Sequence, residues 1–289
     1  MQVKVTVLVD DVVGRRGTLA EHGLSLLAEI GADGLETSVL LDVGTTPSVF
    51  RHNVEVLGAD LSKVDAIVVS HGHYDHTGGL LEALRMVGRR IPVIVHPNAF
   101  TPKLAYREAL RWIGGPTLRE IRDAGGIPLV VTESVILAKK QTGMEEKPIV
   151  MTTGEIPRIS DFEKVEEFWT VIDGRFVRDE MPDDQAVVIR GDEGIVLLTG
   201  CAHSGIINTA WHAQKIAKME RIKAIIGGFH LMSASRERIE RTVQELTKLN
   251  PELMAPGHCT GLEATNAIMR AFGDRCRPIS TGAVIELEV

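Results

Sequence analysis

The stretch 65-DAIVVSHGHYDHTGGL-80 places three histidines and one aspartate within six consecutive positions, directly after an apolar run. Residues 66–69 predict a buried strand, because they are apolar and mostly β-branched. The residues from Ser70 onward would then form the loop at the carboxyl end of that strand, where α/β sheets usually place ligand sites. The stretch therefore predicts a mixed α and β fold with a functional site at a strand end.

The spacing of the polar residues in this loop suits metal ligation. In an extended segment alternate side chains share a face, so His71 and His73 can point together, and a turn brings Asp75 and His76 beside them. Imidazole suits Zn, Fe, Mn or Ni, and a carboxylate suits the harder of these ions, so the loop alone does not select the metal. The alternative is a histidine-rich surface loop that caps the following helix, but such loops rarely group four ligand side chains after a buried strand.

The rest of the chain alternates strand-like runs with amphipathic helical patterns. Apolar β-type runs lie at residues 3–9, 38–41, 66–69, 93–95, 186–189, 195–198, 224–226 and 284–287. Helices are predicted at 78–88, 206–219 and 234–250, where apolar residues recur at three- to four-residue spacing. Residues 186–200 predict a hairpin, since two apolar runs flank a glycine-containing turn. We expect a single domain over residues 1–289.

A less regular segment at about residues 97–178 predicts a cap-like insertion over the site. It holds two helix-like patterns, at 103–113 and 116–126, followed by glycine, proline and charged residues. Its aromatic residues are candidates either for stacking on a planar substrate or for core packing: Tyr106, Trp112, Phe162, Phe168 and Trp169. Its cations Lys103, Arg107 and Arg111 are candidates either for phosphate binding or for a solvated helix face.

Composition and charge narrow the function classes. Hydrophobic residues make up 44% and charged residues 25% of the chain, and no apolar run is long enough to cross a bilayer. The N-terminus has the pattern of a strand rather than of a signal peptide, so we expect a soluble cytoplasmic protein with no membrane partner. A net charge of −7 without a basic cluster argues against nucleic acid and leaves an anionic small molecule as the expected partner. The oligomeric state is not indicated.

Several motifs carry a resemblance to a known family. The sequence SHGHYDHTGGL is similar to the H-x-H-x-D-H signature of the metallo-β-lactamase superfamily, and LLDVGTT, LLTGCAHSG, IIGGFHL and MAPGHCTG extend the resemblance over residues 38–261. The resemblance implies an αβ/βα four-layer sandwich with a dinuclear metal site at one edge between two sheets. It also implies two divalent ions, zinc first and Mn or Fe as alternatives, with a metal-bound hydroxide as the nucleophile.

The resemblance also assigns roles to individual residues. It places His71, His73 and His203 on one ion, and Asp75, His76 and His258 on the other. Asp75 and His230 are the residues expected to take part in catalysis. His230 has three open roles: metal ligand, proton donor to the leaving group, or satisfied core histidine.

Three further residues keep two interpretations each. Many members of the superfamily have a bridging aspartate where this chain has Cys201, which is either a thiolate ligand or a small buried residue. His22 is either a residue at the edge of the site or a helix cap. Asp42 either orients a ligand histidine through its free ring nitrogen or forms an Asx turn before Gly44.

Hydrolysis of an ester, a phosphodiester or a related substrate is the function that such a site implies. Within the superfamily, DDQAVVI, TGCAHSGIINT, GGFHL and APGHCTG most resemble the dihydropteroate-synthase-like branch. That branch implies an alternative, a transferase that condenses a pterin with an arylamine ribosyl phosphate in methanopterin-type biosynthesis. A second alternative is a non-catalytic sensor of metal or redox state through Cys201, which would have full ligand shells without an exchangeable water.

Overall fold

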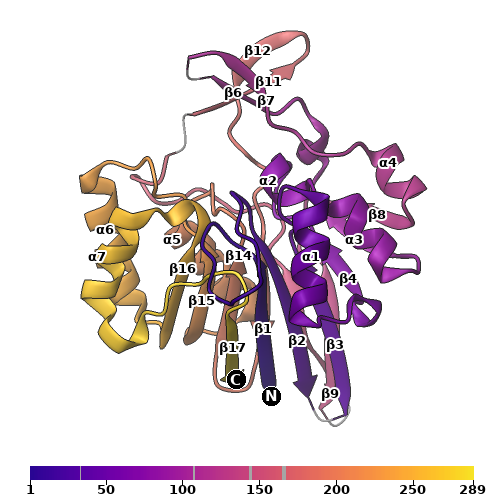
Figure 1. The fold of residues 1–289 in the computed structure, drawn as a ribbon. Helices are drawn as coiled ribbons and strands as arrows, with labels where there is room; N and C mark the ends of the chain where they lie inside the picture. The colour runs from indigo at the N-terminus through magenta and orange to yellow at the C-terminus, as the bar shows by residue number, and fades with distance from the viewer. Residues whose placement is uncertain (33, 107, 143–144, 165–166) are drawn as a thin grey trace.

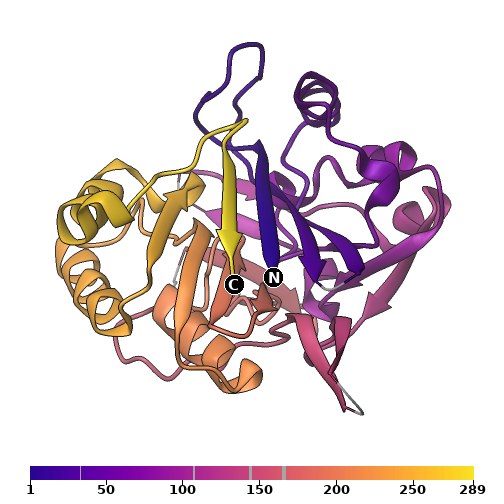
Figure 2. The same ribbon diagram turned by 90° about the horizontal axis from the view of Figure 1, so that it is seen from below.

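The protein is described from a computed structural model, which covers all residues except 33, 107, 143–144 and 165–166. Two large β-sheets pack face to face, and helices cover the outer face of each, so the fold is the expected αβ/βα four-layer sandwich (Figures 1 and 2). A third, smaller sheet stands above one edge of the sandwich (Figure 1). The mixed α and β fold predicted from the strand-end loop is confirmed.

The first large sheet has seven strands. Their order is β17 (Val284–Glu288), β1 (Gln2–Val9), β2 (Ser25–Ala32), β3 (Leu35–Leu41), β4 (Ala66–Val68), β5 (Ile91–Val95) and β8 (Gly126–Val130). From β3 to β8 the strands run parallel, so their carboxyl ends meet at one edge of the sheet. Helices α1 (Pro47–Leu57), α3 (Leu80–Val87) and α4 (Leu118–Asp123) belong to this half.

The second large sheet has six strands. Their order is β16 (Leu253–Gly257), β15 (Ile222–Gly228), β14 (Ile195–Thr199), β13 (Ala186–Arg190), β10 (Glu145–Thr152) and β9 (Ile136–Thr142). Strands β14, β15 and β16 are parallel, and β13 and β14 form the predicted hairpin. Helices α5 (Ile206–Ala217), α6 (Arg236–Leu249) and α7 (Leu262–Phe272) cover its outer face, and Ser235 caps α6.

The central strands are apolar on both faces because each sheet is covered on both sides. In β14, Val196 and Leu198 point into the core between the two sheets, whereas Ile195 and Leu197 pack against the helices. Burial of both faces explains why β14 appears in the sequence as an unbroken apolar run. The same packing holds the carboxyl ends of β3, β4, β14, β15 and β16 near one edge of the sandwich.

The segment expected to be a cap divides between two places. Strands β6 (Leu104–Tyr106), β7 (Leu110–Trp112), β11 (Phe168–Ile172) and β12 (Arg175–Arg178) form the small sheet, which we call the cap sheet. The residues between β7 and β11 contribute α4, β8, β9 and β10 to the main layers instead. A cap over the whole of residues 97–178 was therefore too broad an expectation.

The helix predicted at 103–113 is wrong, whereas the helix predicted within 116–126 is present as α4. Strands β6 and β7 pair with each other, with Leu104 opposite Trp112, and β6 also pairs with β11. Pairing with a distant strand supplies backbone hydrogen bonds that outweigh the local helical spacing. Within the described ranges, none of the helices has the length and apolarity that a membrane crossing requires.

Candidate metal centre

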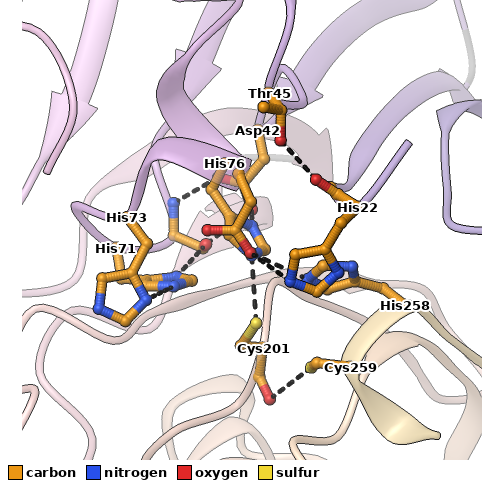
Figure 3. A network of polar contacts seen from close by, with 12 residues as sticks. His22, Asp42, Thr45, His71, His73, His76, Cys201, His258 and Cys259 are labelled. Carbon is orange, nitrogen blue, oxygen red and sulfur yellow. Dashed lines mark hydrogen bonds and ion pairs between the residues drawn. The ribbon is translucent and has the colours of Figure 1, made fainter. Parts of the chain in front are cut away.

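Polar side chains from five strand ends converge at the edge of the sandwich below the cap sheet. Asp42 follows β3, the His71 loop follows β4, Cys201 and His203 follow β14, His230 follows β15, and His258 follows β16. Figure 3 shows the side chains of His71, His73 and His76 beside those of Cys201 and His258. The convergence brings together segments that are far apart in the sequence, as the strand-end argument predicted.

His71, His73 and His203 form the first group of ligand side chains. His71 Nε2 lies 3.1 Å from His73 Nδ1 and 3.1 Å from His203 Nε2. All three side chains are buried, and one nitrogen of each lies within 4.8 Å of the others. The structure thus assembles the three histidines that the resemblance assigned to one ion.

Asp75, His76, Cys201 and His258 form the second group, and their ligand atoms also lie within 4.8 Å of one another. Asp75 Oδ2 is 3.4 Å from His258 Nε2 and 3.5 Å from His76 Nε2. Cys201 Sγ lies 3.1 Å from His76 Nε2. The second group therefore contains the three residues expected there together with the cysteine at the position of the usual bridging aspartate.

The ligand side chains are held in place by neighbouring carboxylates. Asp42 Oδ2 lies 2.7 Å from His76 Nδ1 and accepts a hydrogen bond from the Ser70 hydroxyl, which in turn lies 2.9 Å from His71 Nδ1 (Figure 3). Asp11 Oδ1 lies 2.7 Å from His258 Nδ1. Such contacts fix the ring orientation of a histidine, so the second nitrogen of each ring can face an ion.

His22 lies at the edge of the site in a loop, and its side chain is half exposed. Its Nδ1 is 2.9 Å from Asp11 Oδ2, and its Nε2 is 3.5 Å from Asp75 Oδ2. The helix-cap interpretation of His22 is wrong, because no helix begins at this loop. His96, by contrast, caps a short 3-10 helix by accepting a hydrogen bond from the Asn98 backbone N–H.

Backbone strain is concentrated at the strand ends that carry the site. Asp42, Ala202, His230 and His258 all have φ between 45° and 58°, a left-handed conformation that side-chain-bearing residues rarely adopt. Such conformations persist only where the surrounding structure enforces them, and they gather at functional sites. The strain at four strand ends supports a functional rather than a purely structural role for this edge.

Burial and charge set different protonation states in the two groups. Burial lowers the pKa values of His71, His73 and His203, that of His73 to about 3, so these rings are neutral and have free lone pairs. In the second group burial opposes protonation of His76, but the charges of Asp75 and Asp42 outweigh it and raise its pKa to about 9. Burial also opposes protonation of His258, but Cys259, Asp11 and Asp75 outweigh it and raise its pKa, so without a cation both rings carry positive charge beside the carboxylates.

A pocket of about 440 Å³ opens onto both groups. Its lining includes His73, Asp75, Cys201, His203 and His230 from the base, with Phe168 and Trp112 from the cap sheet. Arg111 also lines it. The cap sheet therefore contributes aromatic and cationic side chains directly to the space above the histidines.

The other candidates of the cap segment have different surroundings. Phe162 packs against the helices of the second half, Trp169 stacks on Phe176 at 4.7 Å, and Tyr106 is exposed. Lys103 is fully buried between two aspartates, so the phosphate-binding and solvated-face interpretations of this residue are both wrong. Arg107 lies outside the described residues.

Sequence reasoning assigned no role to five residues around the site: Asp10, Asp11, Asp183, Asp184 and Cys259. Asp10 and Asp11 directly follow β1, so the strand-end rule applied to the N-terminal run would have found them. Asp183 and Asp184 precede β13, where that rule does not look. Cys259 donates to the Cys201 carbonyl and accepts from the His230 N–H, contacts that no local pattern indicates.

At Gly78 the backbone of the ligand loop packs closely against the segment that follows β3. Replacing Gly78 tests how much stability depends on this close packing. A Cβ at Gly78 would lie 1.9 Å from the Thr45 carbonyl oxygen, although the backbone has helical angles that alanine would normally favour. We expect Gly78→Ala to lower the free energy of unfolding by about 2 kcal/mol or more, measured in urea. Gly31→Ala, where nothing lies within 4 Å, should stay within about 1 kcal/mol of the wild type. Equal effects of the two changes would contradict this interpretation.

Known proteins resemble this chain in fold and in sequence over nearly its whole length. The model of the "Metallo-beta-lactamase superfamily" matches residues 24–258. The chain is 30% identical to the 7,8-dihydropterin-6-methyl-4-(beta-D-ribofuranosyl)-aminobenzene-5'-phosphate synthase of Methanocaldococcus jannaschii, over 98% of this chain and 96% of that protein. It is 32% identical to an uncharacterized protein of the same organism, over 90% and 91% of the two chains. The crystal structure of Tm1679, described as a metal-dependent hydrolase of the beta-lactamase superfamily, is 29% identical with a TM-score of 0.79 over 99% of both chains.

Proposed function

This chain belongs to the metallo-β-lactamase superfamily, and on that premise we propose that it is an enzyme that uses two divalent ions to hydrolyse an anionic small molecule. The observation that carries the proposal is the pair of adjacent ligand groups beneath one pocket. The rings of His71 and His76, one from each group, have their centroids 4.2 Å apart, so the two groups are directly adjacent. Such an arrangement suits two neighbouring ions that act on one substrate.

The geometry of the first group fits a metal ion. Two imidazole nitrogens on one tetrahedral zinc, each about 2.05 Å from the ion, lie roughly 3.3 Å apart. The 3.1 Å spacings around His71 Nε2 are close to that value. In the second group the buried His258 Nε2 makes no hydrogen bond among the described residues and lies 3.4 Å from the Asp75 carboxylate, an arrangement that a cation between the two would satisfy. We propose zinc, with Mn or Fe as alternatives, because imidazole ligands predominate.

The residues of the site have different proposed roles in hydrolysis. Two bound divalent ions would supply a water acidified toward neutral pH and would polarise an oxygen of the substrate. We propose that Asp75, the carboxylate of the second group, orients this water as well as holding an ion. His230 lines the pocket beside His203, with ring centroids 4.2 Å apart, and we propose that it donates a proton to the leaving group. Side chains of the cap sheet line the pocket, and we propose that they limit the access of bulk water to a bound substrate.

Metal binding is expected to release protons. Since the pKa of His76 is raised to about 9, a cation at pH 7 must displace its proton, and apparent metal affinity should fall about tenfold per pH unit below 9 for each proton displaced. Calorimetry in buffers of different ionisation enthalpy measures the proton count. At least one proton released per chain agrees with His76 or His258 as a ligand, whereas none released would exclude both.

A transferase is the second candidate, and two observations favour it. The relative from Methanocaldococcus jannaschii is named as a synthase of a dihydropterin joined to a ribofuranosyl aminobenzene phosphate. In this chain the pocket is roofed by Phe168 and Trp112, which can stack on a planar ring, and Arg111 can pair with an anionic group. The same ions would then activate a diphosphate leaving group instead of a water.

Parallel assays separate the two reactions. The metal-loaded protein is offered chromogenic phosphodiesters and esters in one series, and a pterin diphosphate with an arylamine ribosyl phosphate in the other. Chelator-sensitive hydrolysis in the first series supports the hydrolase. Condensation without hydrolysis supports the transferase, and inactivity in both with full metal loading would support a non-catalytic sensor.

A further inference from the structure

We propose that Asp183, held in place by Lys103 at the base of the cap sheet, is a positioning residue for the loop that carries His71 and His73. Asp183 lies outside both ligand groups and does not line the pocket above them. The inference rests on the proposed function only in taking that loop as the place where an ion binds. Its first test, the exchange of backbone amides, needs no metal.

Asp183 is held in place by a buried lysine, Lys103, which we call the anchor. Lys103 is fully buried, and its Nζ lies 2.6 Å from Asp183 Oδ1 and 2.9 Å from Asp179 Oδ2. Lysine is almost never buried without a charged partner, because removing its charge from water is costly. Here two carboxylates supply the compensation, and Asp183 itself is fully buried.

The anchor sits where the chain enters and leaves the cap sheet. Lys103 directly precedes β6, the first cap strand, and Asp179 directly follows β12, the last one. Their ion pair therefore ties the two ends of the cap segments together at the surface of the sandwich.

Asp183 connects the anchor to the ligand loop. Its Oδ2 accepts a hydrogen bond of 2.8 Å from the backbone N–H of Gly72, the residue between His71 and His73. The loop is also held from the other side, since Gly115 donates to the Gly72 carbonyl and Tyr74 donates to the Ile113 carbonyl. Both partners lie just after β7, so the loop is fixed between two segments that lead out of the cap.

The functional consequence concerns the spacing of the ligand nitrogens. Support around a ligand histidine determines how closely a site matches the geometry of its ion, and loss of such support typically costs about 10–100-fold in affinity. A bond to the peptide between two ligands controls both at once. A purely structural salt bridge would stabilise the fold without a selective effect on the loop.

Asp183→Ala and Asp179→Ala form a matched pair. Each change removes one carboxylate from Lys103, but only Asp183→Ala removes the acceptor of the Gly72 N–H. In the metal-free protein, we expect hydrogen exchange over residues 70–77 to become faster in Asp183→Ala and to stay unchanged in Asp179→Ala. Asp183→Asn, whose amide oxygen can still accept from Gly72, should retain most of the protection.

Zinc affinity, measured by competition with a chromophoric chelator, gives the second readout. We expect Asp183→Ala to weaken the binding of the ion at the first group by about 10–100-fold and Asp179→Ala by less than about 3-fold. Thermal midpoints measured in parallel show whether the loss follows global stability. Equal exchange and equal affinity in the two alanine variants would overturn the proposal.

The proposed function fails in a different way. If the wild type binds zinc but hydrolyses nothing, the positioning role of Asp183 is still decided by comparing the two variants. If the wild type binds no zinc, the exchange over residues 70–77 decides alone: faster exchange only in Asp183→Ala supports the positioning role, and any other pattern refutes it.

Discussion

Replacing His71 with alanine is expected to remove one of the two proposed ions and to lower hydrolysis by about 10³-fold or more. His71 is central to the first group, because its Nε2 lies 3.1 Å from the ligand nitrogens of both His73 and His203. Without it, the two remaining nitrogens lack the third ligand that a catalytic site normally keeps. The side chain is also fully buried, so another residue cannot readily take its place.

His96→Ala is the matched control for this experiment. His96 is also a buried histidine directly after a strand of the first sheet, but it belongs to neither ligand group. We expect this control to keep both ions and most of its activity. Metal content and turnover are measured on the same samples. Two ions per chain in His71→Ala would show that the ligand assignment is wrong.

Replacing His230 with glutamine is expected to keep both ions and to lower kcat by about 10²–10⁴-fold on substrates with a poor leaving group. Burial opposes protonation of His230, but Cys259 and Glu167 outweigh it and raise its pKa to about 9. The ring therefore carries a proton at neutral pH and can deliver it as the bond to the leaving group breaks.

Leaving-group chemistry supplies the control. A nitrophenolate departs without a proton, so the same variant should hydrolyse a nitrophenyl substrate at nearly the wild-type rate. The wild type should lose activity on the poor leaving group as the pH rises through about 9, because the acid form disappears, and the variant should lack this step. An equal loss on both substrates, or a loss of metal, would instead make His230 a ligand or a structural residue.

The ligand groups could be predicted from sequence because each ligand follows an apolar strand-like run. The loops after β4, β14 and β16 carry His71, His203 and His258, and parallel strands bring such loops to one edge. The resemblance supplied the assignment to two ions, and the structure brings both sets of side chains together, alongside two overlapping groups, Cys201–His230–Cys259 and Asp11–His22–His258. The position of Cys201 in the second group could not be predicted, because a buried cysteine and a ligand cysteine have the same sequence pattern.

The contacts of the supporting residues could not be predicted because they span long sequence separations, although the strand-end rule would have placed Asp11 at this edge. Asp11 meets His258 across 247 residues, and Asp183 meets Gly72 across 111. The secondary structure of the cap sheet was predicted wrongly for a related reason. Local spacing at 103–113 favours a helix, and pairing with β7 and with the distant β11 makes β6 a strand instead. Periodicity reports the face of an element, whereas these features depend on which elements become neighbours.

Metal content of the purified wild type, determined by elemental analysis before and after chelation and reloading, tests the central claim most directly. The account predicts two divalent ions per chain, with turnover lost when they are removed and regained when they are restored. No bound ion under any loading condition, or turnover that survives complete removal of metal, would contradict it.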